Sequence, residues 1–245
     1  MAYAHGRRTA IALASLLGVA ATTSATYRET VVANGGRITG TVRVTGVVTP
    51  LPAQPVFKEK DFCGSVPDER LVVDATGNLA GAVVHLAGIE TGKPVPKSEL
   101  VRLDNRRCAF VPHVATASVG QTLEMRNEDP FLHDAHAIRG AETLFNLAIP
   151  KGRTVRHVLD SPGIAHVNCN VRHTWMHAYL FVAEDPYHAV TGGGGRFVLD
   201  DVPPGTYAIT VWHEILGGRE RRVTVAPGET ATVDFELQAV APENQ

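Results

Sequence analysis

The residues best suited to chemistry gather in one short segment, Cys169-Asn-Val-Arg-His173-Thr-Trp-Met176. It holds a thiol, an imidazole and a thioether. Soft sulfur donors together with imidazole select copper over hard cations. A second imidazole would complete a trigonal His₂Cys site with a weak axial methionine, and His133 supplies one upstream, after Asn127-Glu-Asp-Pro-Phe-Leu. We therefore predict a mononuclear copper site formed by His133, Cys169, His173 and Met176.

Two other interpretations compete with this site. Zinc could bind Cys169 and the two histidines tetrahedrally if a fourth, hard ligand were present. The methionine favours copper, because the chain has only three methionines and one of them falls at the axial position. The plainer alternative is that Trp175 and Met176 are core residues and Cys169 is a buried, inert thiol.

The remaining histidines are weaker candidates. His136 lies three residues after His133, which in a strand places the two on opposite faces. His177 should point away from Met176 for the same reason, although an axial His177 would give the site a harder donor. His113 is best interpreted as a polar residue near a strand end.

The elements that must position these residues are short strands. The chain has 23 glycines and 15 prolines, and apolar alternation recurs between turn signals rather than in long helical patterns. Regular spacing of such strands is typical of β-sandwiches. The fold class is therefore all-β, with strands expected near residues 37–44, 71–74, 82–87, 108–119, 121–126, 135–138, 144–149, 154–159, 164–171, 178–183, 196–199, 207–212, 221–225 and 230–237.

The ligand motif resembles the cupredoxins, the small blue-copper proteins, over about residues 100–184. In that family a histidine follows an Asn-containing loop, as His133 does here, and the Cys, second His and Met share the loop between the last two strands. The His-x-x-Met spacing is similar to that of amicyanin, whereas Cys-x₃-His is one residue longer than the family's usual Cys-x₂-His. The resemblance implies a Greek-key β-sandwich, a type 1 copper site and electron transfer with a redox partner protein.

A second resemblance covers about residues 185–240. The stretch Gly192-Gly-Gly-Gly-Arg-Phe-Val-Leu-Asp-Asp-Val-Pro-Pro-Gly-Thr-Tyr207 is similar to the carboxypeptidase regulatory-like family. That family implies a smaller, transthyretin-like β-sandwich with a carbohydrate-binding-like fold. Few aromatic residues are available to stack on a sugar, so a glycan ligand is a weak expectation and a structural or docking role is favoured. The two parts together look like bacterial proteins labelled methylamine-utilisation or plastocyanin-like.

The expected organisation is a signal peptide (1–25), an N-terminal β segment (26–99), the cupredoxin-like domain (100–184), the second sandwich (185–240) and a tail (241–245). The N-terminal strands could complete either sandwich. Residues 36–44 and 81–87 resemble the first strands of the carboxypeptidase regulatory-like sandwich, so the cupredoxin-like module could be inserted in it.

Residues 1–25 have the features of a secretory signal peptide. Arg7 and Arg8 precede an apolar run that is too short to span a bilayer, and small residues follow it, ending at Ala25. The alternative is an uncleaved N-terminal anchor. The expected location is therefore periplasmic or secreted, where disulfides are permitted.

The three cysteines fit that compartment. With Cys169 assigned to the cupredoxin-like ligand loop, Cys63 and Cys108 remain to form a disulfide. The alternative, three free thiols, is disfavoured in an oxidising compartment.

The net charge of −2 and the lack of a basic stripe argue against nucleic-acid binding. No nucleophile elbow or phosphate loop is visible, and we predict no enzymatic activity. The favoured hypothesis is an extracytoplasmic copper protein that transfers electrons. The alternatives are copper capture or delivery by the same ligands, and a cell-envelope binding or scaffold module without a redox role.

Overall fold

The computed structural model describes residues 27–171 and 173–239, and regular structure in this part of the chain is almost entirely β. One short helix, α1 (Lys60–Cys63), is present in it. The predicted all-β fold class is confirmed. The predicted signal peptide and the tail lie outside the described residues. Among those residues no helix is both long enough and apolar enough to cross a membrane.

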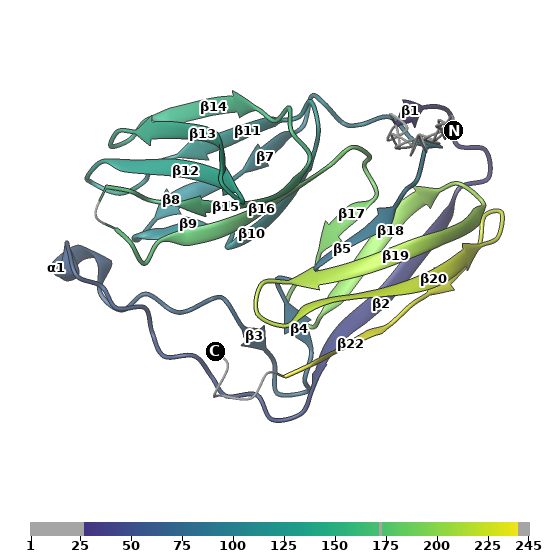
Figure 1. The fold of residues 1–245 in the computed structure, drawn as a ribbon, viewed down its shortest axis with the longest axis horizontal. Coiled ribbons are helices and arrows are strands. Elements are labelled where there is room, and N and C mark those ends of the chain that lie inside the picture. Colours follow the sequence, from purple (N-terminus) through teal and green to yellow (C-terminus); the bar gives the residue numbers. More distant parts are fainter. Residues whose placement is uncertain (1–26, 172, 240–245) are drawn as a thin grey trace, which may run out of the picture.

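The strands form two sandwiches that lie side by side (Figure 1). The first sandwich packs a five-stranded sheet, in the order β10-β16-β15-β12-β13, against a three-stranded sheet, β14-β11-β7. Its strands are β7 (Leu100–Arg102), β10 (Val114–Ser118), β11 (Thr122–Arg126), β12 (His133–Arg139), β13 (Glu142–Ile149), β14 (Thr154–Val158), β15 (Gly163–Asn168) and β16 (His177–Ala183).

The second sandwich packs a sheet of order β17-β5-β19-β20 against one of order β18-β2-β21, in which β22 also pairs with β2. Its strands are β2 (Gly36–Thr45), β5 (Val83–Ala87), β17 (His188–Val190), β18 (Arg196–Val202), β19 (Gly205–His213), β20 (Gly217–Val225), β21 (Thr230–Thr232) and β22 (Phe235–Gln238).

Three two-stranded ladders complete the fold. They pair β1 (Arg28–Glu29) with β6 (Thr91–Gly92), β3 (Val72–Val73) with β4 (Leu79–Ala80), and β8 (Asp104–Arg106) with β9 (Ala109–Val111). A long connection that carries α1 links β2 to β3 and runs past the open end of the first sandwich (Figure 1).

The pairing answers the question that the sequence leaves open about the N-terminal strands. Arg37 pairs with Thr230 across β2 and β21, and Val83 pairs with Trp212 across β5 and β19. Both strands thus belong to the second sandwich, which is larger than residues 185–240 alone. The chain leaves the second sandwich after β5, builds the first sandwich, and returns at β17.

Each sandwich has its own apolar core, and a smaller cluster joins the two. The joining cluster buries Val83, Val114, Phe181 and Ala183, and Tyr179 and Trp212 pack edge-to-face against each other beside it. Burial of these side chains favours a fixed arrangement of the two sandwiches, because apolar area removed from water stabilises by roughly 25 cal/mol per Å².

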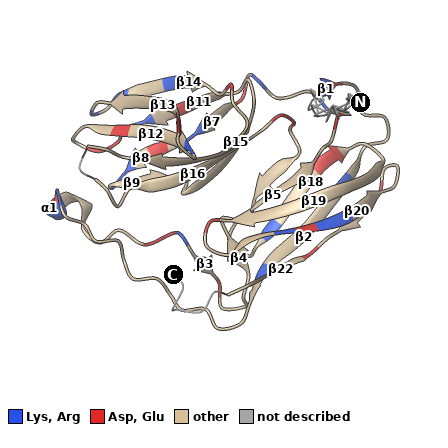
Figure 2. Ribbon diagram, in the orientation of Figure 1, with Lys and Arg blue, Asp and Glu red and all other residues tan. Residues whose placement is uncertain are grey.

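Charged side chains mark the exposed edge of the second sandwich. β20 is an edge strand, and Figure 2 shows basic residues along it. Arg219, Arg221 and Arg222 are exposed there, whereas Val223 and Val225 are buried. Charges on an edge strand oppose pairing with another chain.

Most predicted strands coincide with observed ones, with two informative differences. The stretch 108–119 was expected to be continuous, but it divides into β9 and β10 around Pro112. Proline has no N–H to donate to a ladder, which explains the interruption. The short strands β7, β8 and β17 were not predicted, because they have little apolar alternation.

Candidate metal centre

Three donor atoms converge at one end of the first sandwich. The Cys169 Sγ lies 3.6 Å from the His133 Nδ1 and 3.7 Å from the His173 Nδ1. The three residues form a possible metal-binding group, which we call the His₂Cys cluster, and each is at most 2% exposed. The structure therefore brings together three of the four predicted ligands through one sulfur and two imidazole nitrogens.

Neighbouring strands of one sheet supply these residues. His133 is the first residue of β12, and Cys169 directly follows β15, which pairs with β12. His173 and Met176 lie in the loop that leads into β16. The loop is closed by two backbone hydrogen bonds, in which the Met176 N–H donates to the His173 carbonyl (2.8 Å) and the Cys169 N–H to the Met176 carbonyl (3.3 Å). The loop thus turns back on Cys169.

A buried carboxylate orients His133. The Nε2 of His133 lies 2.9 Å from Asp129 Oδ2, and Asp129 also accepts the N–H groups of Arg107 (2.7 Å) and Cys108 (2.8 Å). Burial opposes ionisation of Asp129, but these hydrogen bonds outweigh it and hold its pKa below the usual value. With Nε2–H donated to Asp129, the Nδ1 of His133 carries the lone pair that a metal requires.

Asp134 and Asn127 hold the backbone on either side of the donors in place through hydrogen bonds. Asp134 Oδ1 accepts the N–H of Asn170 (2.5 Å) and of Val171 (3.2 Å), which holds the chain directly after Cys169. Asn127 donates from its Nδ2 to the carbonyls of Phe131 and Ile149, at 2.7 Å each. Sequence reasoning did not single out Asp129 or Asp134. The position of Asp129, four residues before His133, was the available signal.

Burial favours the neutral forms of Cys169 and His173. Burial raises the pKa of the Cys169 thiol to about 11. Burial, and then the charge of His133, lowers the pKa of His173 to about 4. A metal must therefore displace the thiol proton, whereas the imidazole of His173 needs no deprotonation at neutral pH.

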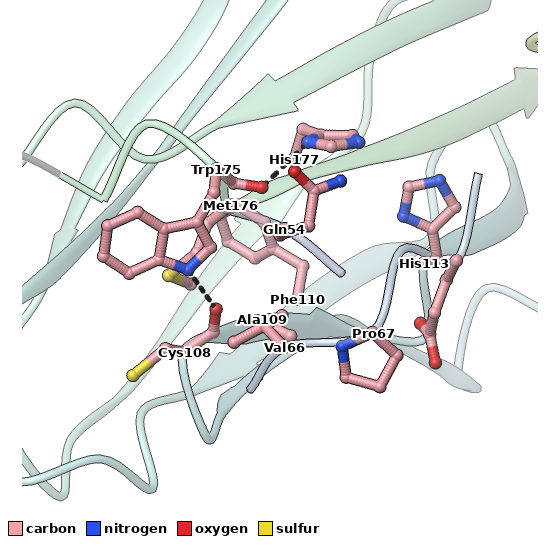
Figure 3. Close-up of a pocket in the computed structure, with 11 residues that line it drawn as sticks. Gln54, Val66, Pro67, Cys108, Ala109, Phe110, His113, Trp175, Met176 and His177 are labelled. Carbon is pink, nitrogen blue, oxygen red and sulfur yellow. Dashed lines mark hydrogen bonds between the residues drawn. The ribbon is translucent and has the colours of Figure 1, made fainter. Parts of the chain in front are cut away.

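Aromatic side chains pack against the cluster. Phe131 and Trp175 pack against His173, with ring centroids 5.3 and 5.2 Å apart, and Met176 is 1% exposed. The Trp175 Nε1–H donates to the Cys108 carbonyl at 3.0 Å (Figure 3). This shell excludes water from the donors.

The Trp175 contact connects the cluster to a disulfide. Cys63 at the end of α1 is bonded to Cys108, and Cys169 is free and buried. The disulfide therefore ties the long connection after β2 to Cys108, whose N–H donates to Asp129 and whose carbonyl accepts from Trp175.

The other candidate histidines, His136, His177 and His113, lie outside the His₂Cys cluster. His136 contacts Thr143 Oγ1 and Asn170 Nδ2 at 2.9 Å each, outside the His₂Cys cluster. His177 extends toward His113, away from the Met176 sulfur (Figure 3). His177 is therefore not placed as an alternative axial donor. His113, expected to be only a polar strand-end residue, forms a second cluster with His177 and Glu214.

Comparison with known families supports the resemblance predicted for the C-terminal part. Residues 158–238 match the family model of the carboxypeptidase regulatory-like domain. The match begins before the expected boundary at residue 185 and includes β15 and β16, which pair within the first sandwich. No curated protein matches the chain.

Solved structures similar to parts of the chain include cupredoxins, the family that the ligand motif resembles. A novel purple cupredoxin from Nitrosopumilus maritimus is 21% identical, with coverage of 34% of this chain and 98% of that one and a TM-score of 0.30. Amicyanin from Paracoccus versutus is 15% identical, with coverage of 40% and 96% and a TM-score of 0.31.

A copper-containing nitrite reductase from Thermus scotoductus is 25% identical, with a TM-score of 0.32. The likeness covers 47% of this chain but only 25% of the reductase. All these overlaps are partial. The donor set and its geometry, rather than these likenesses, support a metal centre.

Proposed function

We propose that the protein binds one copper ion at the His₂Cys cluster and transfers electrons outside the cytoplasm. The observation that carries this proposal is the convergence of Cys169 Sγ with the Nδ1 atoms of His133 and His173 in a buried, water-excluding pocket. One thiolate and two imidazoles suit copper in both of its common oxidation states. Met176, which is buried in the same apolar core as Cys169, is the proposed weak axial donor.

Bound copper would supply the one-electron redox chemistry, and the chain's own residues would keep its surroundings constant. Asp129 holds His133 in one tautomer, and Asp134 holds the loop after Cys169. Phe131 and Trp175 limit access of water to His173. Fixed donors keep the structural change between oxidation states small, which favours fast electron transfer.

An apolar surface next to the cluster fits a redox partner protein. Phe57 and Leu132 are 68% and 42% exposed, and Phe57 packs against Trp175, which contacts His173. We take these two exposed side chains as part of the proposed docking surface. A partner docked there would be close to His173.

The test is titration of the purified protein with Cu(II), followed by absorption and electron-spin-resonance spectroscopy. The protein should bind one copper through this cluster with an intense thiolate-to-copper band, and Cys169→Ser should abolish the band. His157→Gln is a matched control, because His157 packs on Phe145 away from the cluster and should leave the band unchanged.

Two results would contradict the proposal. Absence of the band in the wild-type protein, or binding indifferent to Cys169→Ser, would exclude a thiolate-bound copper. A band accompanied by rapid loss of copper to a chelator and by no reversible potential would indicate copper capture or delivery instead of electron transfer.

A further inference from the structure

A second set of donors lies between the two sandwiches. His113 precedes β10, His177 is the first residue of β16, and Glu214 lies in the turn between β19 and β20. One donor atom from each lies within 4.8 Å of the other two. We call this group the His₂Glu cluster. Two of its members come from the first sandwich and one from the second.

His177 is oriented as a ligand. Its Nδ1 lies 2.9 Å from the Trp175 carbonyl, and because a carbonyl only accepts, Nδ1 carries the proton. The lone pair is then on Nε2, which is buried and has no hydrogen-bond partner. A histidine bound to a metal typically donates its other N–H to a carbonyl or carboxylate in this way.

Glu214 and His113 are held in the same buried place. Their side chains are 6% and 12% exposed, and His113 Nε2 is in close contact with Glu214 Oε1. His213 braces the turn, because its Nδ1 accepts the N–H groups of Ile215 (3.3 Å) and Leu216 (3.4 Å). The carboxylate is thus presented to the first sandwich by a turn with little freedom.

The Arg70 guanidinium, a nearby cation, forms its ion pair with Asp68 rather than with Glu214. Arg70 is paired with Asp68, whose Oδ2 lies 2.6 Å from the Arg70 Nη2. The other aromatic neighbours, His166 and Tyr179, stack on each other with ring centroids 4.9 Å apart. The buried carboxylate therefore has His113 as its close polar partner, and the His177 Nε2 faces the same region without one.

A small cavity adjoins the two histidines. Its volume is about 20 Å³, and its lining includes His113, His177 and Met176 (Figure 3). A site of this size has room for about one water molecule. Two imidazoles, one carboxylate and one water are a donor set that Zn²⁺ takes in proteins.

We propose that His113, His177 and Glu214 bind a second metal, a divalent ion such as Zn²⁺, which clamps the two sandwiches together. Zinc bonds to nitrogen and oxygen are about 2.0–2.2 Å long, so tetrahedral donors lie roughly 3.3–3.6 Å apart. The donor atoms lie within 4.8 Å of one another, so binding requires small side-chain shifts, including a slight separation of His113 from Glu214. The donors are imidazole and carboxylate, which distinguishes this site from the sulfur-containing His₂Cys cluster.

The clamp also lies next to the proposed copper site. His177 directly follows Met176 in the chain, and its ring is hydrogen-bonded to the carbonyl of Trp175, which packs on His173. Metal binding at the His₂Glu cluster would therefore fix the backbone of the loop that carries His173 and Met176. The clamp itself does not depend on copper binding at the first cluster.

The test measures zinc bound by the full chain after equilibration with Zn²⁺ and dialysis. Because zinc could also occupy the His₂Cys cluster, the decisive measurement uses the Cys169→Ser protein. It should retain one zinc, and adding Glu214→Gln should remove that zinc. The affinity loss should exceed the 10–100-fold that loss of an outer partner costs. Glu220→Gln, at an exposed position of β20, is the matched control and should bind zinc like its parent.

A second readout guards against misfolding of the variant. Zinc should raise the midpoint of thermal unfolding of the Cys169→Ser protein. Adding His113→Gln, which removes a ligand on the first sandwich, should abolish this rise. Zinc-edge anomalous diffraction of the wild-type protein should place an ion between His113, His177 and Glu214. A Cys169→Ser protein without zinc, or one whose zinc survives both Glu214→Gln and His113→Gln, would overturn the proposal. Neither result would bear on copper binding at the His₂Cys cluster.

Discussion

The His₂Cys and His₂Glu clusters differ in what holds their donors. Residues of one sandwich form the first, where Asp129 and the closed loop around His173 fix each donor before any ligand arrives. The second joins two sandwiches, and its carboxylate comes from a turn remote in sequence from either histidine. The first depends on the fold of one sandwich, whereas the second depends on how two sandwiches meet.

The two clusters also differ in the metals that their donor atoms suit. One thiol and two imidazoles that converge in a closed aromatic pocket are suited to a tightly held soft metal. Imidazole and carboxylate beside a small cavity suit a borderline divalent ion that keeps a water ligand. In the two proposals, the adjacent residues Met176 and His177 belong to chemically different sites.

Removing the disulfide should produce the largest change. The bridge joins residues 45 apart, and its loss should lower the free energy of unfolding by about 4 kcal/mol because the unfolded chain gains freedom. We expect Cys63→Ala with Cys108→Ala to weaken copper binding more than zinc binding, because the lost bridge no longer holds in place the backbone N–H of residue 108 that donates to Asp129. Urea unfolding and metal competition measure the two effects. An equal loss of copper affinity and zinc affinity would contradict the inference that different contacts hold the two clusters in place.

Asp129→Asn should weaken copper binding by 10–100-fold, about 1.4–2.8 kcal/mol. The asparagine amide group would face one of the backbone N–H groups that Asp129 now accepts, and the His133 ring would lose its charged partner. Competition with a copper chelator measures the affinity. Zinc binding by the His₂Glu cluster should stay the same, and a parallel loss there would show that the variant disturbs the whole sandwich.

Met176→Leu should have the smallest effect on folding, under about 1.5 kcal/mol, because the two side chains are similar in volume. If Met176 is the weak axial donor, its loss should destabilise Cu(II) relative to Cu(I) and raise the reduction potential. Voltammetry measures the potential, and thermal unfolding of the metal-free protein measures the stability. An unchanged potential would remove Met176 from the proposed ligand set.

Much of the fold was predictable because each strand has its own apolar pattern. The stretches 37–44 and 207–212 alternate and are observed as β2 and β19. The pairing of β2 with β21 was not predictable, because alternation says which face is buried but not which strand lies alongside. Pro112 interrupts a run that the apolar pattern made continuous.

The same distinction applies to the sites. Cys169 and His173 were predictable as candidates because their donor types and spacing share one loop, and His133 because it follows an Asn-containing loop upstream. Asp129 acts through His133, and the available signal was its position four residues before that histidine. Glu214 joins His113 only through the contact between sandwiches, a separation of 101 residues that no local pattern spans.

The split of the second sandwich has a consequence for the order of folding during synthesis. Thr41 in β2 is hydrogen-bonded to Asp234, 193 residues later, so this sandwich cannot close until nearly all of the described chain has been made. The strands of the first sandwich are contiguous and are complete at Ala183. A nascent chain can therefore assemble the His₂Cys pocket while β2 and β5 are still unpaired. The proposed copper ion could then bind before synthesis of the chain is complete.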